Sequence, residues 1–215
     1  MVKSRVRIYI EGGSVGRSAD NDFRRGWKKF LGELHQLAMA NGFQSLEVVR
    51  GKSRRNAFER FAKHHQEYPD DLCFLLVDSE GPVRSKQQVW DVVALREGDQ
   101  WAKPRWASED DLFLIVQFVE TWLVTDPDAL RAFFGPDIDI SKLPTDNLEA
   151  RSKGDIDRAL RDATMGCRKG PYRHGHAHAV LELVRPPRVK NLYHGNRLFA
   201  KVGERIKQNR QGGRR

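Results

Sequence analysis

Six consecutive apolar residues, at positions 72–77, run directly into Asp78. A run of this length without a polar interruption is typical of a strand that is buried on both faces. Such a strand lies inside a parallel sheet with helices on either side, because helices are what cover both of its faces. This segment constrains the fold more than any other, and it predicts an α/β protein.

The segments around this run have the spacing of a parallel sheet flanked by helices. Residues 6–10 and 46–49 are typical of strands, and the helical periods of 20–40 and 56–66 separate the three strands. Strand, helix, strand, helix, strand in this order implies right-handed crossovers. A further apolar segment, 112–124, suits a fourth strand at its front, and its back fits either strand or helix.

The chain is expected to form a main α/β domain over 1–150, with a polar insertion at about 81–110. A basic extension over 151–207, helical or irregular, is expected to pack on or beside this domain. The last residues, 208–215, are polar and basic and are expected to form a disordered tail.

Positive charge is concentrated in this extension. Residues 151–215 contain 17 Lys and Arg but 5 Asp and Glu, whereas residues 1–150 contain 21 and 24, so the net charge of +9 comes from the last third of the chain. Such an excess indicates a polyanionic partner, most simply nucleic acid, or serves solubility alone. A membrane surface is disfavoured, because no apolar face rich in Trp and Leu accompanies the charge.

Other features exclude several classes of protein. No stretch approaches the ~18 apolar residues of a membrane span, and the basic, alternating first residues do not resemble a signal peptide. The two cysteines, Cys73 and Cys167, are too few for a disulfide framework, so the expected compartment is the cytoplasm.

Acidic residues follow two of the predicted strands. Glu11 comes directly after 6–10, and Asp78 and Glu80 follow the buried run, where an extended backbone would point both side chains the same way. Ligands of open α/β sheets bind at the carboxyl ends of the strands, and converging carboxylates favour Mg²⁺ or Mn²⁺. Alternatively, each carboxylate caps the next helix or faces solvent. The turn at Gly12 and Gly13 is neither a Walker loop nor a full dinucleotide fingerprint.

Two further groups of residues have alternative interpretations. His174, His176 and His178, with Cys167, could bind Zn²⁺, could join a phosphate-facing basic loop with Arg168, Lys169 and Arg173, or could form an ordinary loop. The helical spacing of Trp27 and Trp122 predicts core positions. The other three tryptophans lie in the polar insertion, where they could stack on bases or dock a partner: Trp90, Trp101 and Trp106.

Several blocks of sequence, spread over roughly 5–185, match known families. The specific blocks are Val-Asp-Ser-Glu-Gly-Pro-Val at 77–83 and Gln-x-x-x-Glu-x-Trp-x-x-x-Asp at 117–126. The weaker blocks are 8–13, 23–27, 55–58, Trp101 with Pro104, 133–135, and Lys169 with Tyr172. They resemble the Toprim fold of topoisomerases, primases and the nucleases of overcoming-lysogenization-defect type, and more closely an uncharacterised Toprim-like family, the domain of unknown function 4276, whose members are often encoded beside ABC/AAA-type ATPases in bacterial defence loci. This resemblance makes docking of such an ATPase the preferred interpretation of the tryptophans in the insertion.

The resemblance implies roles for individual residues. In Toprim enzymes the first Glu does acid/base work and an Asp-x-Asp pair holds Mg²⁺, which corresponds here to Glu11, Asp78 and Glu80, with Glu80 in place of the second Asp. Glu120, and less directly Asp126, would join the same metal site, although Glu120 is equally interpreted as a helix-surface charge.

Basic residues are candidates for contacts with the substrate phosphates, since guanidinium groups fit phosphate oxygens bidentately. Arginines at 54 and 55 would be unfavourable at a helix start, which mildly favours an anion there. The alternative for each is a solvated surface charge. The candidates are Arg24, Arg54, Arg55, Lys169, Arg173 and His174.

Together these features predict a Mg²⁺- or Mn²⁺-dependent nuclease that hydrolyses phosphodiester bonds of DNA or RNA. The resemblance implies an effector subunit of a bacterial anti-phage system that works with an ABC/AAA-type ATPase. A non-catalytic nucleic-acid-binding or adaptor subunit is the alternative, and a small-molecule phosphotransfer enzyme or phosphatase is a third hypothesis. The sequence is compatible with a homo-oligomer as well as with a monomer.

Overall fold

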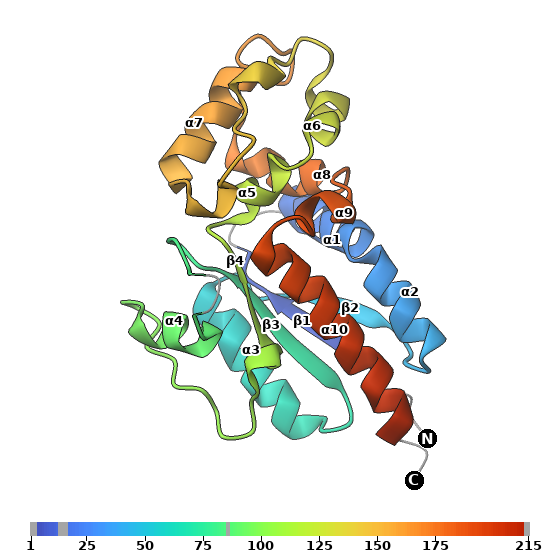
Figure 1. Cartoon of the computed structure of the whole chain (residues 1–215). Helices are drawn as coiled ribbons and strands as arrows, with labels where there is room; N and C mark the ends of the chain where they lie inside the picture. The colour runs from blue at the N-terminus through green and yellow to red at the C-terminus, as the bar shows by residue number, and fades with distance from the viewer. Residues whose placement is uncertain (1–3, 13–16, 85–86, 213–215) are drawn as a thin grey trace.

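The computed structural model describes residues 4–12, 17–84 and 87–212, and it confirms the predicted α/β fold (Figure 1). Its four strands are all parallel and lie in the order β2-β1-β3-β4. Their bounds are β1 Val6–Ile10, β2 Leu46–Arg50, β3 Leu72–Asp78 and β4 Leu112–Ile115. The apolar run of the sequence is β3, which has strands on both sides, so its burial follows from its central place.

Helices cover both faces of the sheet. The first face packs against α1 Arg17–Phe30, α2 Gly32–Ala40 and α10 Tyr193–Gly212, and the second against α3 Arg54–Glu67 and α4 Val89–Leu95. Alternate residues of β3 divide between the faces, because successive side chains of a strand point to opposite sides. Phe74 and Leu76 join the first core, whereas Leu75 and Val77 join the second.

The segment 119–181 forms what we term the cap. Its helices are α5 Val119–Leu123, α6 Pro127–Phe134, α7 Lys153–Thr164 and α8 Ala177–Leu181, and the short helix α9 Pro186–Val189 leads from it into α10. Single-turn 3₁₀ helices lie at Glu109–Asp111, Ile140–Lys142, Leu148–Ala150 and His174–His176. Figure 1 shows α5, α6 and α7 grouped at one end of the molecule, with α10 running along the sheet.

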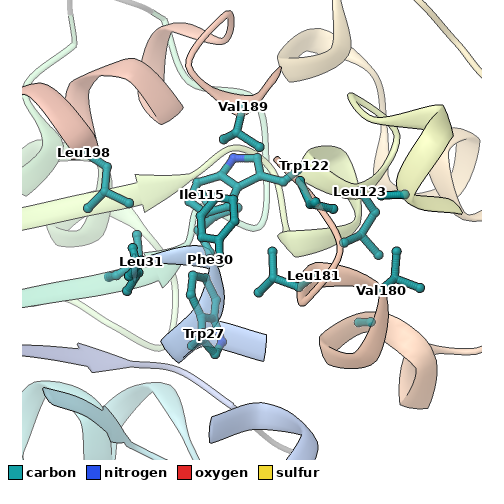
Figure 2. Close-up of a cluster of buried hydrophobic side chains, with 14 of the residues drawn as sticks. Trp27, Phe30, Leu31, Ile115, Trp122, Leu123, Val180, Leu181, Val189 and Leu198 are labelled. Atoms are coloured by element: carbon teal, nitrogen blue, oxygen red, sulfur yellow. The ribbon is translucent and has the colours of Figure 1, made fainter. Parts of the chain in front are cut away.

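One hydrophobic core joins the cap to the sheet. Trp122 of α5 packs against Trp27 and Phe30 of α1, with ring centroids 6.0 and 5.4 Å apart. Figure 2 shows these rings surrounded by side chains from β4, α8, α9 and α10. Trp27 and Trp122 are therefore core residues, as their spacing predicts. The basic extension contributes to the same core through Ile156, Leu198 and Ile206, among others.

Trp90 and Trp101 of the 81–110 insertion are also core residues, so the prediction that these two tryptophans stack on bases or dock a partner is wrong. Trp90 and Trp101 are 2% and 7% exposed. The ring of Trp101 stacks on Phe58 at 4.5 Å, and the half-buried Trp106 lies 5.4 Å from Phe61. The physical reason is that β1, β3 and β4 present apolar side chains on the second face, and this insertion with α3 covers them.

The basic extension is more ordered than the sequence suggests. α10 continues to Gly212, so residues 208–212, expected to be disordered, belong to a helix, and 213–215 lie outside the described residues. Much of its charge is used within the fold. Arg197 and Arg205 pair with Asp110 and Asp111, each at 3.1 Å, in the acidic turn before β4.

Within the described ranges, no helix combines the length and apolarity needed to cross a bilayer.

Trp101→Ala should lower the free energy of unfolding by about 3 to 5 kcal/mol, because truncating a buried aromatic side chain leaves a cavity. Denaturant unfolding followed by circular dichroism measures this. Leu95→Ala on α4 is the control, since Leu95 is 81% exposed and its loss should change stability by no more than about 0.5 kcal/mol. Equal stability of the Trp101 variant and the parent would contradict a core role.

Candidate functional site

A cavity of about 410 Å³ lies where the carboxyl ends of β1 and β3 meet the cap. Its lining includes Glu11 and Asp78 from the sheet. The cap contributes Glu120 from α5, Asp157 from α7 and His174 from the 3₁₀ helix at 174–176. These five ionisable groups, which come from five segments of the chain, therefore share one space.

Glu11 and Asp78 come together because β1 and β3 are adjacent and parallel. Ile10 lies opposite Leu76 in the ladder, so the residues that follow leave the sheet side by side. The backbone N–H of Glu11 donates to the carbonyl of Leu76 at 3.3 Å and continues this pairing by one residue. The prediction that strand ends bring these two carboxylates to one edge agrees with the geometry.

Burial raises the pKa of Glu11, and the guanidinium of Arg54 partly offsets this, with Nη1 at 3.2 Å from Oε2 of Glu11. The pKa of Asp78 lies well above its usual range, chiefly because of burial and then because of the nearby carboxylates of Glu11, Glu120 and Glu80. Carboxylates whose charged forms are disfavoured in this way are stabilised by a cation.

Glu80 lies beside the cavity but does not line it. Its backbone has φ of +64°, so the chain turns at Glu80 and the extended conformation assumed from the sequence does not hold there. The side chain forms an ion pair with Lys153 of α7. Glu80 therefore acts on Asp78 electrostatically, while its own direct partner is Lys153 of the cap.

Glu120 is 3% exposed and is held at the start of α5, which contradicts its interpretation as a helix-surface charge. The hydroxyl of Tyr172 donates to its Oε1 at 2.8 Å, and Nδ1 of His174 lies 2.7 Å from the same oxygen. Tyr172 is itself buried, and its backbone N–H donates to Oγ1 of Thr164 at 2.7 Å. The carboxylate of Glu120 is therefore fixed in place at the cavity wall.

Sequence reasoning missed Asp157 and Lys153, which both line the cavity. They are four residues apart on α7, so they occupy the same helix face one turn apart. The sequence does show that α7 is amphipathic, with Ile156 and Leu160 on its buried face. This period does not show that the adjacent face, which carries Lys153 and Asp157, lies against the end of the sheet. Oδ1 of Asp157 is buried and has no hydrogen-bond partner among the described residues.

Asp126 lies apart from this cavity, contrary to the metal role that the resemblance implies. It is fully buried, and its two carboxylate oxygens accept hydrogen bonds from the guanidinium of Arg185 at 2.6 and 2.8 Å. These contacts hold its pKa below the usual range even though burial acts in the opposite direction. Asp126 therefore joins the start of α6 to the segment before α9.

The arginines predicted at the start of α3 have structural roles. Arg54 is buried and donates hydrogen bonds to both carboxylate oxygens of Asp99 and to the carbonyl of Asp78. It therefore joins the 81–110 insertion to the end of β3. It is not a surface phosphate contact, because the 81–110 insertion folds over it. Arg55 is exposed and pairs with Glu59 one turn along the helix at 2.9 Å.

The remaining basic candidates are exposed and lie in two places. Arg24 lines a separate groove of about 480 Å³ beside the edge strand β2. Lys169 and Arg173 are on the cap, where the ammonium of Lys169 lies 4.3 Å from the ring centre of Phe133. Of the predicted phosphate-binding residues, His174 lines the cavity, Arg54 contacts Glu11 behind its wall, and Arg24 lines a separate groove.

The three histidines and Cys167 do not form a zinc site. His176 lies against the rings of Phe133 and Phe134, and His178 packs edge-on against Phe23 at 4.9 Å. Burial lowers the pKa of His178 to about 4. Among the residues that the structure describes, only His174 of this motif belongs to a group with metal-ligand geometry, and its partners are Glu120 and Asp157.

The carboxylates around the cavity are candidate ligands for a divalent metal ion, and among the described residues the group whose ligand atoms lie within 4.8 Å of one another is Glu120, Asp157 and His174. The cavity and its rim bring together carboxylate oxygens of Glu11, Asp78, Glu80, Glu120 and Asp157. Oxygen-rich sites of this kind suit Mg²⁺ and Mn²⁺. The raised pKa values of Glu11 and Asp78 show that Arg54 and Lys153 do not fully offset burial and the repulsion between the carboxylates, and Oδ1 of Asp157 has no partner among the described residues.

Comparison with known proteins gives one match. A family model described as Domain of unknown function (DUF4276) matches residues 10–202. No curated protein and no solved structure shows a significant match to the chain.

Asp78→Asn should stabilise the metal-free protein at neutral pH. Because the pKa of Asp78 is higher in the folded than in the unfolded state, its ionisation opposes folding, and the stability present below pH ~4 is lost as pH rises through the folded-state value. The variant lacks this charge, so its free energy of unfolding in EDTA at pH 7 should exceed that of the parent by about 0.5 to 2 kcal/mol.

The difference between the Asp78 variant and the parent should shrink toward pH 4. Urea unfolding across this pH range measures both effects, with Asp70→Asn as the control because Asp70 is exposed. A variant that is less stable than the parent at pH 7 would show that ionised Asp78 is not destabilising.

Proposed function

The chain belongs to the DUF4276 family, and we propose that it is a metal-dependent nuclease that hydrolyses phosphodiester bonds of DNA or RNA. The observation that carries this proposal is the convergence of Glu11 and Asp78, from adjacent strand ends, with Glu120 and Asp157 of the cap. The resemblance of the sequence blocks around these residues to Toprim nucleases supports the same proposal.

The residues that would hold the ion are Asp78 and Glu80, with Glu11 and Glu120 beside them. A bound Mg²⁺ or Mn²⁺ polarises a phosphate oxygen and lowers the pKa of an attacking water. Glu11 is suited to accept a proton from that water, because its raised pKa lies closer to neutrality than that of an ordinary carboxylate. Arg54 keeps the Glu11 carboxylate in position through its hydrogen bond.

Lys153 is suited to neutralise the substrate phosphate. Its ammonium lies 4.9 Å from the ring centre of Phe118 and pairs with Glu80 at the rim of the cavity. A phosphate that entered the cavity would compete with Glu80 for this lysine. The lysine would then offset charge on the phosphate oxygens while the aspartates and glutamates face the ion.

A basic groove beside β2 supports nucleic acid as the substrate class. It is lined by Arg24 and Lys28 of α1, by Arg50 at the end of β2 and by Arg60 of α3, with Glu47 as its acidic residue. Arg50 is buried, and its Nε donates to the carbonyl of Gly12, a residue that lines the cavity. One hydrogen bond thus connects a residue of the groove with a residue of the cavity, and a nucleic-acid strand bound in the groove would extend toward the carboxylates.

A binding-only adaptor would use the same basic groove. It would have no use for the cavity, where carboxylates held together oppose the approach of a polyanion unless a cation is bound. We therefore favour the nuclease over the adaptor.

We extend the proposal to the partner that the resemblance implies. The nuclease would act as the effector subunit of a bacterial anti-phage system together with an ABC/AAA-type ATPase. Co-expression with an ATPase encoded next to it, followed by affinity purification, tests this association. Purification of the two proteins as separate species, with and without ATP, would count against it.

Glu11→Gln and Asp78→Asn should each lower the rate of Mg²⁺- or Mn²⁺-dependent cleavage at least about 100-fold, because each removes a charge at the reacting centre. Supercoiled plasmid and labelled RNA are the substrates, and the ATPase partner is added if the chain alone is inactive. Glu59→Gln, an exposed carboxylate of α3, is the control and should cleave like the parent. Parental cleavage by both site variants would show that the proposed site is wrong.

The double variant Arg24→Ala, Lys28→Ala should bind nucleic acid more weakly and with a weaker salt dependence. Each lost phosphate contact on a duplex lowers the slope of log K against log salt by about 0.9. Fluorescence anisotropy in EDTA at several salt concentrations measures this without cleavage. The charge-matched control is Lys63→Ala, Lys142→Ala, two exposed lysines outside the groove. Equal losses in both double variants would show that the groove has no special role.

A further inference from the structure

The cavity has a second group of donors on its cap side. Glu120, Asp157 and His174 each offer one ligand atom, and these atoms lie within 4.8 Å of one another. They come from three segments of the cap, namely α5, α7 and the 3₁₀ helix at 174–176. In the ranges that the structure describes, no other set of His, Cys, Asp and Glu side chains is arranged in this way.

The positions of the two carboxylates are set by the fold. Glu120 is held by the hydroxyl of the buried Tyr172, and Asp157 is fixed on α7 beside the buried Leu160. Arg161 is the helix neighbour of Asp157, with 3.7 Å between Nη2 and Oδ2. The other oxygen of Asp157, Oδ1, is buried with no hydrogen-bond partner among the described residues.

His174 differs from these two residues because its side chain is 69% exposed. Its Nδ1 lies 2.7 Å from Oε1 of Glu120, and its Nε2 lies 3.3 Å from Oδ2 of Asp157. The imidazole therefore bridges the two carboxylates in this structure. Because the ring is at the mouth of the cavity, it can rotate to present one nitrogen to an ion without disturbing the core.

We propose that Glu120, Asp157 and His174 form a second divalent cation site, separate from Glu11, Asp78 and Glu80 and selective for ions that accept nitrogen ligands, such as Mn²⁺, Co²⁺ or Zn²⁺. Ligands bound at about 2.0 to 2.2 Å lie at most about 4.4 Å apart, so small movements of His174 close this group around an ion. A site with one imidazole and two carboxylates favours these ions over Mg²⁺, which prefers oxygen ligands.

The two groups of donors face one space, and Asp78 is influenced electrostatically by Glu120. An ion held by the cap would thus lie beside the ion held by the sheet, and a phosphate in the cavity could contact both. This role rests on the proposed function, whereas the site itself depends only on the three side chains.

The test measures ion binding rather than cleavage. Untagged full-length protein is titrated with Co²⁺ and Mn²⁺ alone, followed by calorimetry and by the visible absorption of bound Co²⁺. His174→Ala and Asp157→Asn should each weaken one class of Co²⁺ site at least about tenfold and change its absorption, because a nitrogen or carboxylate ligand is lost. Glu11→Gln and Asp78→Asn should leave the Co²⁺ absorption of that class of site unchanged, because neither variant removes one of its ligands.

Two matched controls lie close to the site. Asp162→Asn replaces an exposed aspartate of the same helix α7, and His176→Ala replaces a histidine of the same motif whose ring faces Phe133 and Phe134. Both should bind Co²⁺ like the parent. His174→Gln and thermal unfolding of every variant in EDTA separate loss of a ligand from loss of the fold.

Parental Co²⁺ affinity and absorption in both the His174 and Asp157 variants would overturn the second site. If those variants bind Co²⁺ normally while Glu11→Gln abolishes cleavage, the second site is wrong and the proposed nuclease stands. If they lose Co²⁺ while no variant affects cleavage, the second site stands and the proposed nuclease is wrong.

Discussion

The mutual repulsion of carboxylates at the end of a parallel sheet is the constraint on which the rest of the site depends. The ladder between β1 and β3 leaves Glu11 and Asp78 side by side, partly removed from water. Each neighbouring element supplies positive charge or a donor against this repulsion. Arg54 reaches Glu11 from α3, Lys153 reaches Glu80 from α7, and His174 bridges the cap carboxylates. The pKa of Asp78 nevertheless stays well above its usual range, chiefly because the carboxyl is buried and then because of the neighbouring carboxylates.

The basic region 151–215 and the mildly acidic region 1–150 form ion pairs with each other within the molecule. The basic extension suggests a surface for a polyanion, but Arg185, Arg197 and Arg205 form ion pairs with acidic residues of the first 150 residues. Two of these pairs hold α10 against the turn before β4, and the third joins the start of α6 to the segment before α9. The charge left for an external partner is therefore smaller than the sequence suggests. The basic groove beside β2, whose residues all belong to the region 1–150, is the better candidate for contacts with the proposed polyanion.

Aromatic packing explains why the cap and the insertion are integral to the fold. Trp122 enters the core between Trp27 and Phe30, so the helix that carries Glu120 is anchored by its neighbour two residues along the chain. On the opposite face, Trp90 and Trp101 complete the cover over β1, β3 and β4. Asp99 of the same insertion pairs with Arg54, which connects this packing to the position of Glu11. The site is thus held by side chains that lie outside it.

The sequence by itself determined the parallel sheet and the meeting of Glu11 with Asp78. A continuous apolar run requires burial on both faces, and parallel strands end at the same edge, so both follow from local pattern alone. The tertiary structure decided which other side chains join them. Asp157 and Lys153 belong to a helix whose charged face has the sequence pattern of an ordinary solvent-exposed surface. Asp126 belongs to the block at 117–126 that resembles the family, but it pairs with Arg185 away from the cavity. The reason is that contacts between segments more than 30 residues apart depend on how the cap packs on α1, and helical period and spacing carry no information about that packing.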